Sequence, residues 1–345
     1  MIVLATGLPC SKKLEYFKEV KKLAKHNDKD LKIYSVGELI YKAIEEESNL
    51  KLNKKNILNM SEDKLTFLVQ NAYLKIVRDM EKNKVENAII NTHAIFYWKN
   101  IWRDSNNMKF AQDLDPDLYI TIIDSAAVIQ EAMKRNKQWK TQQLTIHEIL
   151  SWQNLETLIT SKYWANAKRK RFFAIPKKQP AETLYKLMFF PKAKTAYASF
   201  PMTNLKNPEE SNKKIDKFIS QLREYFVVID PRTVELSYGA IRAENNQTVH
   251  RDLDLFVGMT DMTVCYYPEI VHSSGAINET VRAHDTTKDV FHIIDLETRS
   301  PFTDYTAEVF RTPEEFFKEL EKRGYKKLKF KRLPRPKSFL RNDFA

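Results

Sequence analysis

Short apolar segments alternate with amphipathic helical patterns along most of this 345-residue chain. The segments at 2–5, 118–123 and 196–200 have the length and apolar character of buried strands. The stretches between them, such as 65–82, carry apolar residues at helical spacing. Strands that alternate with helices form parallel sheets covered by helices. The sequence therefore predicts an α/β fold.

The alternation occurs twice, which predicts two domains, and a length of about 150 residues per domain gives the same number. We expect a first domain at residues 1–178, a linker at 179–194, a smaller second domain at 195–297, and a C-terminal helix with a basic tail at 298–345. Ligands are expected at the carboxyl ends of the strands in each sheet.

Composition narrows the class of protein. The formal net charge is +12, and the two cysteines exclude a disulfide scaffold and fit the reducing cytoplasm. No apolar run approaches the roughly 20 residues that span a bilayer, so we expect no membrane partner. The basic run at 168–171 has no accompanying stacking or groove motif, so we do not expect nucleic-acid binding. The basic tail is either a contact for an acidic partner or a solubilising segment.

A phosphate-binding pattern follows the first predicted strand. The chain has six glycines where an average chain would have about 24, so a retained glycine suggests a place that a side chain cannot occupy. One of them stands in the segment T-G-L-P-C-S-K-K, between a strand and a helix. Backbone N–H groups of such a loop cradle phosphates, and a lysine reaches the outer ones. The candidate phosphate-loop residues are Gly7, Ser11, Lys12 and Lys13.

Two positions depart from the full pattern, G-x-x-x-x-G-K-[ST]. Lys12 replaces the second glycine and must take a backbone geometry that glycine takes easily. Leu14 replaces the Ser or Thr that holds Mg²⁺, and its side chain cannot ligate a metal. ATP with Mg²⁺ is the candidate ligand of this domain. The loop keeps groups that can bind the phosphates but lacks the side chain that normally ligates the metal.

Three segments of the first half match sequence motifs of a known family. They are T-G-L-P at 6–9, I-I-N-T-H-A at 89–94 and L-D-P-D-L-Y-I at 114–120. On these segments residues 1–178 resemble archaeal-type adenylate kinase and related P-loop nucleotide kinases. The resemblance implies a P-loop kinase-like parallel sheet. The family has Asp where Asn91 stands, and an arginine-rich lid where this chain keeps little arginine. The domain is thus either an impaired, nucleotide-sensing relative or an active kinase with substituted parts.

A carboxylate in the second half follows a predicted strand at 263–267. Glu279 comes after a turn expected at Gly275, at the carboxyl end of that strand, where open α/β sheets bind ligands. A carboxylate beneath a sugar can stabilise the oxocarbenium-like state of N-glycosidic cleavage or form a covalent intermediate. A second acid protonates the departing base. The backbone amides of Ser273, Ser274 and Gly275 could hold a phosphate.

Four segments in order extend this pattern: A-Y-A-S-F-P-M at 196–202, V-H-R-D-L-D-L at 249–255, T-D-M-T-V-C-Y-Y at 260–267 and S-S-G-A-I-N-E at 273–279. On these segments residues 195–297 resemble the nucleoside 2-deoxyribosyltransferase superfamily, which includes the 2'-deoxynucleoside 5'-monophosphate N-glycosidases. The resemblance implies a smaller flavodoxin-like or Rossmann-like sheet, no required cofactor or metal, and a homo-oligomer.

The resemblance also assigns roles to single residues. Glu279 would be the nucleophile, Asp252 the acid–base group, and Tyr197 the residue that orients the nucleophile. Asp254 is the alternative to Asp252, because spacing alone does not choose between them. Asp254 and Ser199 would also contact the substrate, together with the amides after the strand.

Ser273 favours a nucleotide as the substrate, since in the glycosidase branch of the family a serine at this position holds the 5'-phosphate. Simpler interpretations stay open: Glu279 as an acid near a helix N-terminus, Asp252 as a helix cap, and Tyr197 as a core residue. The predicted function is cleavage or transfer at the N-glycosidic bond of a nucleoside 5'-monophosphate or related nucleotide. The alternatives are a bifunctional nucleotide-salvage enzyme, a non-catalytic nucleotide sensor and an NAD⁺-cleaving enzyme.

Overall fold

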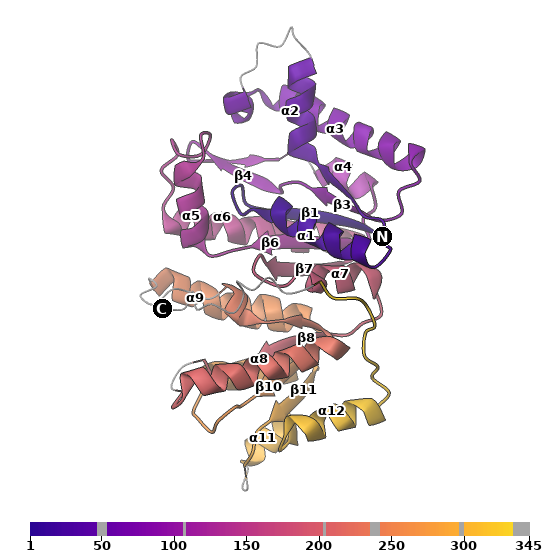
Figure 1. The fold of residues 1–345 in the computed structure, drawn as a ribbon. Helices are drawn as coiled ribbons and strands as arrows, with labels where there is room; N and C mark the ends of the chain where they lie inside the picture. Colours follow the sequence, from indigo (N-terminus) through magenta and orange to yellow (C-terminus); the bar gives the residue numbers. More distant parts are fainter. Residues whose placement is uncertain (47–53, 106–107, 203–204, 235–241, 297–299, 334–345) are drawn as a thin grey trace. The chain divides into compact units, whose positions relative to one another are not determined.

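The chain folds into two compact units, which divide between Ala181 and Glu182 (Figure 1). The computed structural model describes residues 1–46, 54–105, 108–202, 205–234, 242–296 and 300–333. Each unit contains a five-stranded sheet whose neighbouring strands are all parallel, flanked by helices (Figure 1). The predicted α/β fold with two parallel sheets is confirmed. Within the described residues, no helix has both the length and the apolar character that a bilayer crossing requires.

Unit 1 has the strand order β2-β3-β1-β6-β7. Its elements in chain order are β1 (Ile2–Gly7), α1 (Lys13–His26), β2 (Lys32–Ser35), α2 (Val36–Glu46), η1 (Lys54–Asn59), α3 (Glu62–Lys82), β3 (Ala88–Asn91), β4 (Ile95–Trp98), β5 (Ile101–Asp104), α4 (Met108–Asp113), β6 (Leu118–Ile123), α5 (Ala126–Arg135), α6 (Ile146–Leu158), η2 (Ile159–Ala165), η3 (Asn166–Lys168) and β7 (Arg171–Pro176).

Strand β1 lies at the centre of the unit 1 sheet. It pairs with β3 through Val3↔Ile89 and with β6 through Val3↔Leu118. Its residues Leu4 and Ala5 are fully buried, as expected for a strand covered on both faces. The chain places β2 and β3 on one side of β1, and β6 and β7 on the other. The loop after β1 therefore lies where the strand order reverses, which is where open α/β sheets bind ligands.

The sequence did not predict helix α2 or the antiparallel hairpin of β4 and β5. The hairpin turns at Lys99 and Asn100, which have φ of 52° and 59°. Two consecutive residues with positive φ are the geometry of a tight two-residue hairpin turn. Each hairpin strand has only four residues, which is too short for a clear alternation of apolar and polar side chains.

Unit 2 has the strand order β12-β11-β10-β8-β9. Its elements are α7 (Glu182–Phe189), β8 (Thr195–Ser199), α8 (Pro208–Tyr225), β9 (Val227–Ile229), η4 (Pro231–Val234), α9 (Arg242–His250), η5 (Arg251–Val257), β10 (Met262–Tyr266), α10 (Ser274–Asp285), β11 (Asp289–Ile293), α11 (Pro301–Thr306), β12 (Glu308–Phe310) and α12 (Pro313–Lys322).

Strand β8 lies between β9 and β10, and the chain reverses its direction across the sheet at this point. The apolar face of α8 is buried, and the ring of Phe218 stacks on that of Tyr266 in β10 with 4.5 Å between the ring centroids. The residues of β8 are all buried. The carboxyl ends of β8 and β10 therefore form a second switch point, and the strands that form it are packed in the core of unit 2.

Two predicted boundaries differ from the structure. Residues 182–189 form α7, so half of the expected linker is helical, and its residues Leu184 and Leu187 are buried. The segment after 297 is more than a helix and a tail, because β12 pairs with β11 through Phe291↔Glu308. Strand β12 has only three residues, which is too short to recognise from its sequence. The tail beyond residue 333 lies outside the described residues.

Replacing Gly7 with Ala should destabilise unit 1. Gly7 has φ +140°, and a Cβ there would lie 2.6 Å from the carbonyl oxygen of Ile122. We expect the free energy of unfolding to fall by about 2–4 kcal/mol from backbone strain and overpacking. The control Gly37→Ala meets nothing within 4 Å on α2 and should leave stability unchanged or slightly raised.

The measurement is urea unfolding followed by tryptophan fluorescence. All five tryptophans lie between Trp98 and Trp164, so the signal reports unit 1 alone. Equal unfolding midpoints for Gly7→Ala and the wild type would contradict the close approach of the backbone to Ile122.

Candidate functional site

The loop after β1 has the left-handed geometry that glycine normally supplies. Lys12 caps the N-terminus of α1 with φ 54° and ψ 26°, and Cys10 has φ 64°. The Ser11 hydroxyl donates to the carbonyl of Leu8 at 2.7 Å, which closes the loop on itself. The expectation that Lys12 takes a glycine-like conformation is confirmed. The loop thus keeps the shape of a phosphate loop without its second glycine.

Lys13 is buried beneath this loop and is not a surface lysine. Its side chain is 6% exposed, and Nζ donates to the carbonyls of Gly7 at 2.5 Å and Thr92 at 2.9 Å. Both ring nitrogens of His93 lie 3.3 Å from Nζ. Burial lowers the pKa of Lys13 to about 7, against the opposing charge of Glu156. Lys13 therefore joins the loop to the end of β3, with an ammonium group that releases its proton easily.

Glu156 of α6 is a buried acid beside the loop that the sequence analysis missed. It is fully buried, and Oε1 accepts hydrogen bonds from the backbone N–H of Gly7 at 3.0 Å and of Ala94 at 2.9 Å. Oε2 accepts from the N–H of Ile95 at 2.9 Å. Burial raises the pKa of Glu156, while Lys13 and the three N–H donors oppose that rise. One carboxylate thus fixes the start of the phosphate loop and the start of the β4–β5 hairpin.

A signal for Glu156 was present in the sequence. The buried positions of α6 include Ile149, Trp152 and Gln153, which recur at helical spacing and continue to Glu156. An acid at a core position of a helix is rare unless donors meet it. An acidic residue at a position where the helical pattern predicts an apolar one therefore indicates a buried carboxylate with hydrogen-bond donors around it.

Mg²⁺ finds few oxygen ligands at this loop. Leu14 offers none, and Asn91 stands at the end of β3 with its Oδ1 buried and unpartnered. Asp124, which follows β6, is buried, and burial raises its pKa. Carboxamide and carboxylate oxygens are ligands that Mg²⁺ accepts. Asn91 and Asp124 are therefore the residues near this loop that could ligate a metal.

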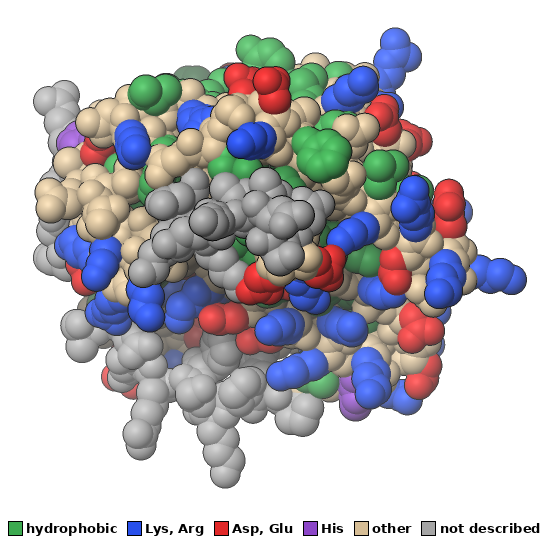
Figure 2. All heavy atoms as spheres, turned by 90° about the horizontal axis from the view of Figure 1, so that it is seen from above, with side chains coloured by type: hydrophobic (Ala, Val, Ile, Leu, Met, Phe, Trp, Pro, Cys, Tyr) green, Lys and Arg blue, Asp and Glu red, His purple; other side chains and the backbone are tan. Residues whose placement is uncertain are grey.

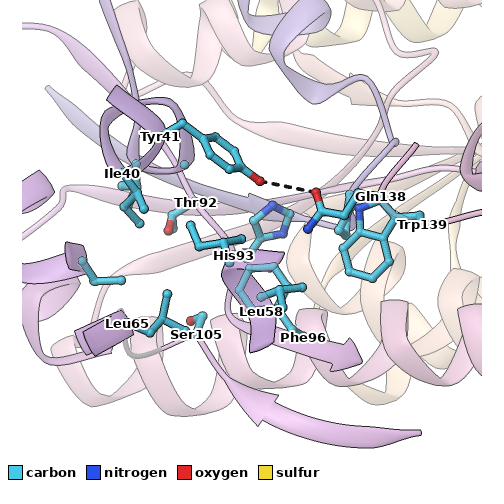
Figure 3. A pocket seen from close by; sticks show the side chains of 15 residues that line it. Ile40, Tyr41, Leu58, Leu65, Thr92, His93, Phe96, Ser105, Gln138 and Trp139 are labelled. Atoms are coloured by element: carbon cyan, nitrogen blue, oxygen red, sulfur yellow. Dashed lines mark hydrogen bonds between the residues drawn. The ribbon is translucent and has the colours of Figure 1, made fainter. Parts of the chain in front are cut away.

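A cavity of about 160 Å³ adjoins the loop (Figure 3). Its walls come from α2, η1, α3, the β3–β4 segment and the region after α5. The lining residues are Pro9, Val36, Gly37, Ile40, Tyr41, Ile57, Leu58, Leu65, Val69, Thr92, His93, Phe96, Ser105, Gln138 and Trp139. Burial and the Lys13 charge hold the pKa of His93 well below its usual range, so its imidazole is neutral at pH 7.

Glu279 of α10 is held by two hydroxyl groups of β8 in unit 2. Tyr197 Oη donates to Glu279 Oε1 at 2.7 Å, and Ser199 Oγ donates to Oε2 at 2.5 Å. The Glu279 side chain is 7% exposed, and Tyr197 and Ser199 are fully buried. Ser199 is the register partner of Cys265 in β10. The predicted nucleophile and its predicted orienting tyrosine therefore meet at the β8–β10 switch point.

Asp252 lies in η5 beside this cluster. It is 5% exposed and accepts a hydrogen bond from Arg251 Nε at 3.2 Å. Burial raises the pKa of Asp252, and Arg251 opposes the rise. The negative charges of Glu279 and Asp252 add to burial in raising the pKa of Tyr197. Two carboxylates and a phenol thus share one buried site, and Asp252 is not a helix cap.

Asp254, the alternative acid, lies at the surface. Its carboxylate is 42% exposed and pairs with Arg282 at 2.8 Å and with His250 at 2.6 Å. Ser199, expected to contact the substrate, donates its hydroxyl hydrogen bond to Glu279.

The phosphate-binding turn differs in form from the prediction. Ser273 is the N-cap of α10, and its Oγ accepts from the N–H of Ala276 at 3.3 Å. The helix therefore begins at Ser274, and the turn expected at Gly275 is wrong. A Cβ on Gly275 would meet nothing within 4 Å, so the space beside the first helical turn is open. Glu279 lies in the same helix, one turn further on.

Among the described residues, no group of three or more His, Cys, Asp or Glu side chains is arranged to hold a metal ion. Lys and Arg side chains on the face shown in Figure 2 are interspersed with acidic and hydrophobic ones.

The comparisons with known proteins concern unit 1. Residues 6–149 match the family model described as AAA domain. No curated protein matches the chain. Among solved structures, shikimate kinase from Bacteroides thetaiotaomicron is similar, with a TM-score of 0.36, 12% identity, and coverage of 56% of this chain and 98% of that chain.

Unit 1 is therefore an α/β domain with a phosphate-loop-like segment after β1, and most of it matches the AAA-domain family model. The match ends at residue 149 and says nothing about unit 2.

Replacing Glu156 with Gln should destabilise unit 1 by about 2–4 kcal/mol. In either orientation, the carboxamide nitrogen would face a backbone N–H of Gly7, Ala94 or Ile95. The control Glu131→Gln breaks an exposed pair with Lys134 and should cost less than about 0.5 kcal/mol. Fluorescence-monitored urea unfolding gives both values. If Glu156→Gln unfolds like the control, the carboxylate does not hold the loop.

Proposed function

We propose that unit 2 cleaves or transfers at the N-glycosidic bond of a nucleoside 5'-monophosphate or related nucleotide. The observation that carries the proposal is a pair of hydrogen bonds. The hydroxyl groups of Tyr197 and Ser199 donate them to the two carboxylate oxygens of Glu279. These bonds fix the carboxylate at a switch point, where α/β sheets bind ligands. Neutral donors orient a carboxylate without cancelling its charge, so it remains available to a cationic transition state.

Glu279 and Asp252 divide the chemistry between them. As the glycosidic C–N bond breaks, a Glu279 oxygen bonds to the anomeric carbon of the sugar. The base leaves with the electron pair and takes a proton from the Asp252 carboxyl group. Water or an acceptor base then attacks the same carbon, returns a proton to Asp252 and releases Glu279. Burial favours the protonated form of Asp252 that the first step needs, because it raises the pKa of that carboxyl group.

The start of α10 supplies the site for the substrate phosphate in this proposal. The backbone N–H groups of Ser274 and Gly275 lie at a helix N-terminus, which favours anions. The Ser273 hydroxyl accepts its cap bond and can still donate a hydrogen bond. The open space beside Gly275 leaves room for the ligand.

The test is chromatographic detection of free base after incubation with nucleosides, nucleoside monophosphates and NAD⁺. We expect base release from a monophosphate, and a loss of about 10³-fold or more in Glu279→Ala. Release from NAD⁺ alone would favour the NAD⁺-cleaving alternative. Binding without any release, with or without an acceptor base, would contradict the glycosidic proposal and favour a sensor.

Asp252→Asn should lower base release by about 10²–10⁴-fold, since it removes the proton donor. Asp254→Asn is the matched control and should stay within about twofold, because Asp254 is exposed and paired with Arg282. The wild-type rate should fall as the pH rises through the raised pKa of Asp252, because deprotonation removes the acid. Steady-state rates across pH measure this, and the opposite ranking of the two variants would assign the role to Asp254.

The loop of unit 1 supports a second candidate function, the binding of a nucleoside triphosphate. Its left-handed residues Cys10 and Lys12 keep the form of a phosphate cradle, and Lys13 lies at its base. Leu14 removes one metal ligand, so we infer that phosphoryl transfer is slow or lost while phosphate binding persists. This assigns unit 1 a nucleotide-binding role beside the chemistry of unit 2.

ATP binding at this loop should take up a proton above pH 7. The free Lys13 has a pKa of about 7 and is largely neutral at pH 9, whereas a phosphate partner favours its charged form. We expect proton uptake approaching one per ATP at pH 9, and less at pH 6. Calorimetry in buffers of different ionisation enthalpy measures it. Lys13→Met should abolish the uptake, and equal uptake in that variant would contradict the assignment to Lys13.

A further inference from the structure

We propose that Arg251 of unit 2 binds the departing base at a carbonyl oxygen and selects nucleotides of 6-oxopurines, such as hypoxanthine and guanine, over those of adenine. The proposal rests on the N-glycosidic function proposed above and names the substrate class of that site. It is carried by a guanidinium group that is buried beside Asp252 and has donors to spare.

Arg251 is buried to a degree that is rare for arginine. The residue is 4% exposed, and its guanidinium group stays charged because it does not lose its proton in proteins. Burying such a charge is costly unless acceptors replace the water that it loses. A cation kept at this position is therefore expected to have acceptors, either from the protein or from a ligand.

The described residues supply acceptors to one part of the guanidinium group. Nε donates to Asp252 Oδ1 at 3.2 Å, and Nη1 donates to the carbonyl oxygen of Val234 at 3.4 Å. Nη2 is buried and has no hydrogen-bond partner within the described part of the chain. Its two N–H groups can therefore donate to a ligand.

The guanidinium group belongs to the buried site around Glu279. η5 is a π-helical turn, in which residues five apart stand over one another, and Arg251 lies 5.5 Å from the ring centroid of Phe256. Phe256 packs against Tyr197 with 6.3 Å between ring centroids, and Tyr197 donates to Glu279. A base that takes its proton from Asp252 therefore lies beside Arg251 as well, since Nε binds the same carboxyl group.

A 6-oxopurine matches the donors of this pair. Its N7 and O6 are neighbouring acceptors, whereas adenine has an acceptor at N7 and an amino donor at C6. As the C–N bond breaks, the base keeps the electron pair, N7 takes the proton of Asp252, and Nη2 of Arg251 donates to O6. The step leaves Asp252 as a carboxylate next to the Arg251 cation.

Adenine is disfavoured by the same geometry. Its amino group at C6 would face the N–H groups of Arg251, so a donor would meet a donor. The buried Nη2 would then stay unpaired in the transition state, and an unpaired buried donor is costly. A site that is built to donate to an oxygen rejects the analogue that lacks the oxygen.

Base release from nucleotides that differ in the group at C6 tests the proposal in the full chain. The probes are inosine and adenosine 5'-monophosphates in ribo and 2'-deoxy form, and cytidine and thymidine 5'-monophosphates complete the panel. Chromatography separates the released bases. We expect kcat/KM for the inosine nucleotide to exceed that for the adenosine nucleotide by about tenfold or more.

Variants of Arg251 assign the preference. Arg251→Met removes the donors and should bring the ratio of the two kcat/KM values to about one. Arg251→Lys keeps the charge without the planar fork and should lower the ratio by a smaller factor. The control Arg282→Met removes a half-exposed cation that pairs with Asp254, and it should keep the wild-type ratio.

The ratio separates recognition of the base from a structural role. If Arg251 only supported the fold or the acid Asp252, its loss would lower both rates by the same factor. Circular dichroism confirms that each variant is folded, and Arg251→Lys carries the test if Arg251→Met does not fold.

Three results would overturn the proposal: a wild type that does not prefer the inosine nucleotide to the adenosine nucleotide, release from pyrimidine nucleotides alone, or a ratio that is unchanged in the folded Arg251 variants. No release from any nucleotide would contradict the N-glycosidic function, and this proposal with it. Release without the expected preference would contradict this proposal alone.

Discussion

A carboxylate can stay inside a protein only if donors replace the water that it loses, and both units are built around such a group. In unit 1 the donors are three backbone N–H groups, which come from the phosphate loop and from the start of the β4–β5 hairpin. In unit 2 they include the hydroxyls of Tyr197 and Ser199. In each case an acid from a helix fixes or meets the carboxyl end of a parallel strand, where ligands are expected.

The two glutamates differ in what their donors leave available. Backbone amides bind Glu156 from two segments, and its side chain is fully buried, so it serves to hold the loop in place. Glu279 is 7% exposed, lies between two side-chain hydroxyls of one strand and has the buried Asp252 nearby. Both carboxylates are removed from water by burial. Glu156 only holds backbone segments together, whereas Glu279 is a candidate nucleophile. The difference lies in the donors and in the opening of the site.

Sequence patterns predicted most strands of the two five-stranded sheets and long helices such as α3, because apolar runs and helical periodicity mark buried elements directly. The resemblance to the deoxyribosyltransferase superfamily paired Tyr197 with Glu279, and the two side chains are hydrogen-bonded in the structure. Their catalytic roles stay a prediction. Sequence patterns failed where the information is not local. Glu156 accepts hydrogen bonds from backbone groups far along the chain, which no local pattern shows. Strand β12 has only three residues, and the cap at Ser273 starts α10 before the expected turn. The choice of Asp252 over Asp254 as the buried acid needed tertiary structure, since burial separates two identical side chains two positions apart.

Trapping the glycosyl-enzyme tests the account's central claim, the nucleophilic role of Glu279, most directly. The wild type would be incubated with 2'-deoxy-2'-fluoro analogues of the nucleoside monophosphates that release base, since the fluorine slows hydrolysis of the intermediate. Peptide mass spectrometry would then locate the sugar phosphate. The account predicts an adduct on Glu279 that is absent from Glu279→Ala. Base release without any adduct, or an adduct on another residue such as Asp252, would contradict it.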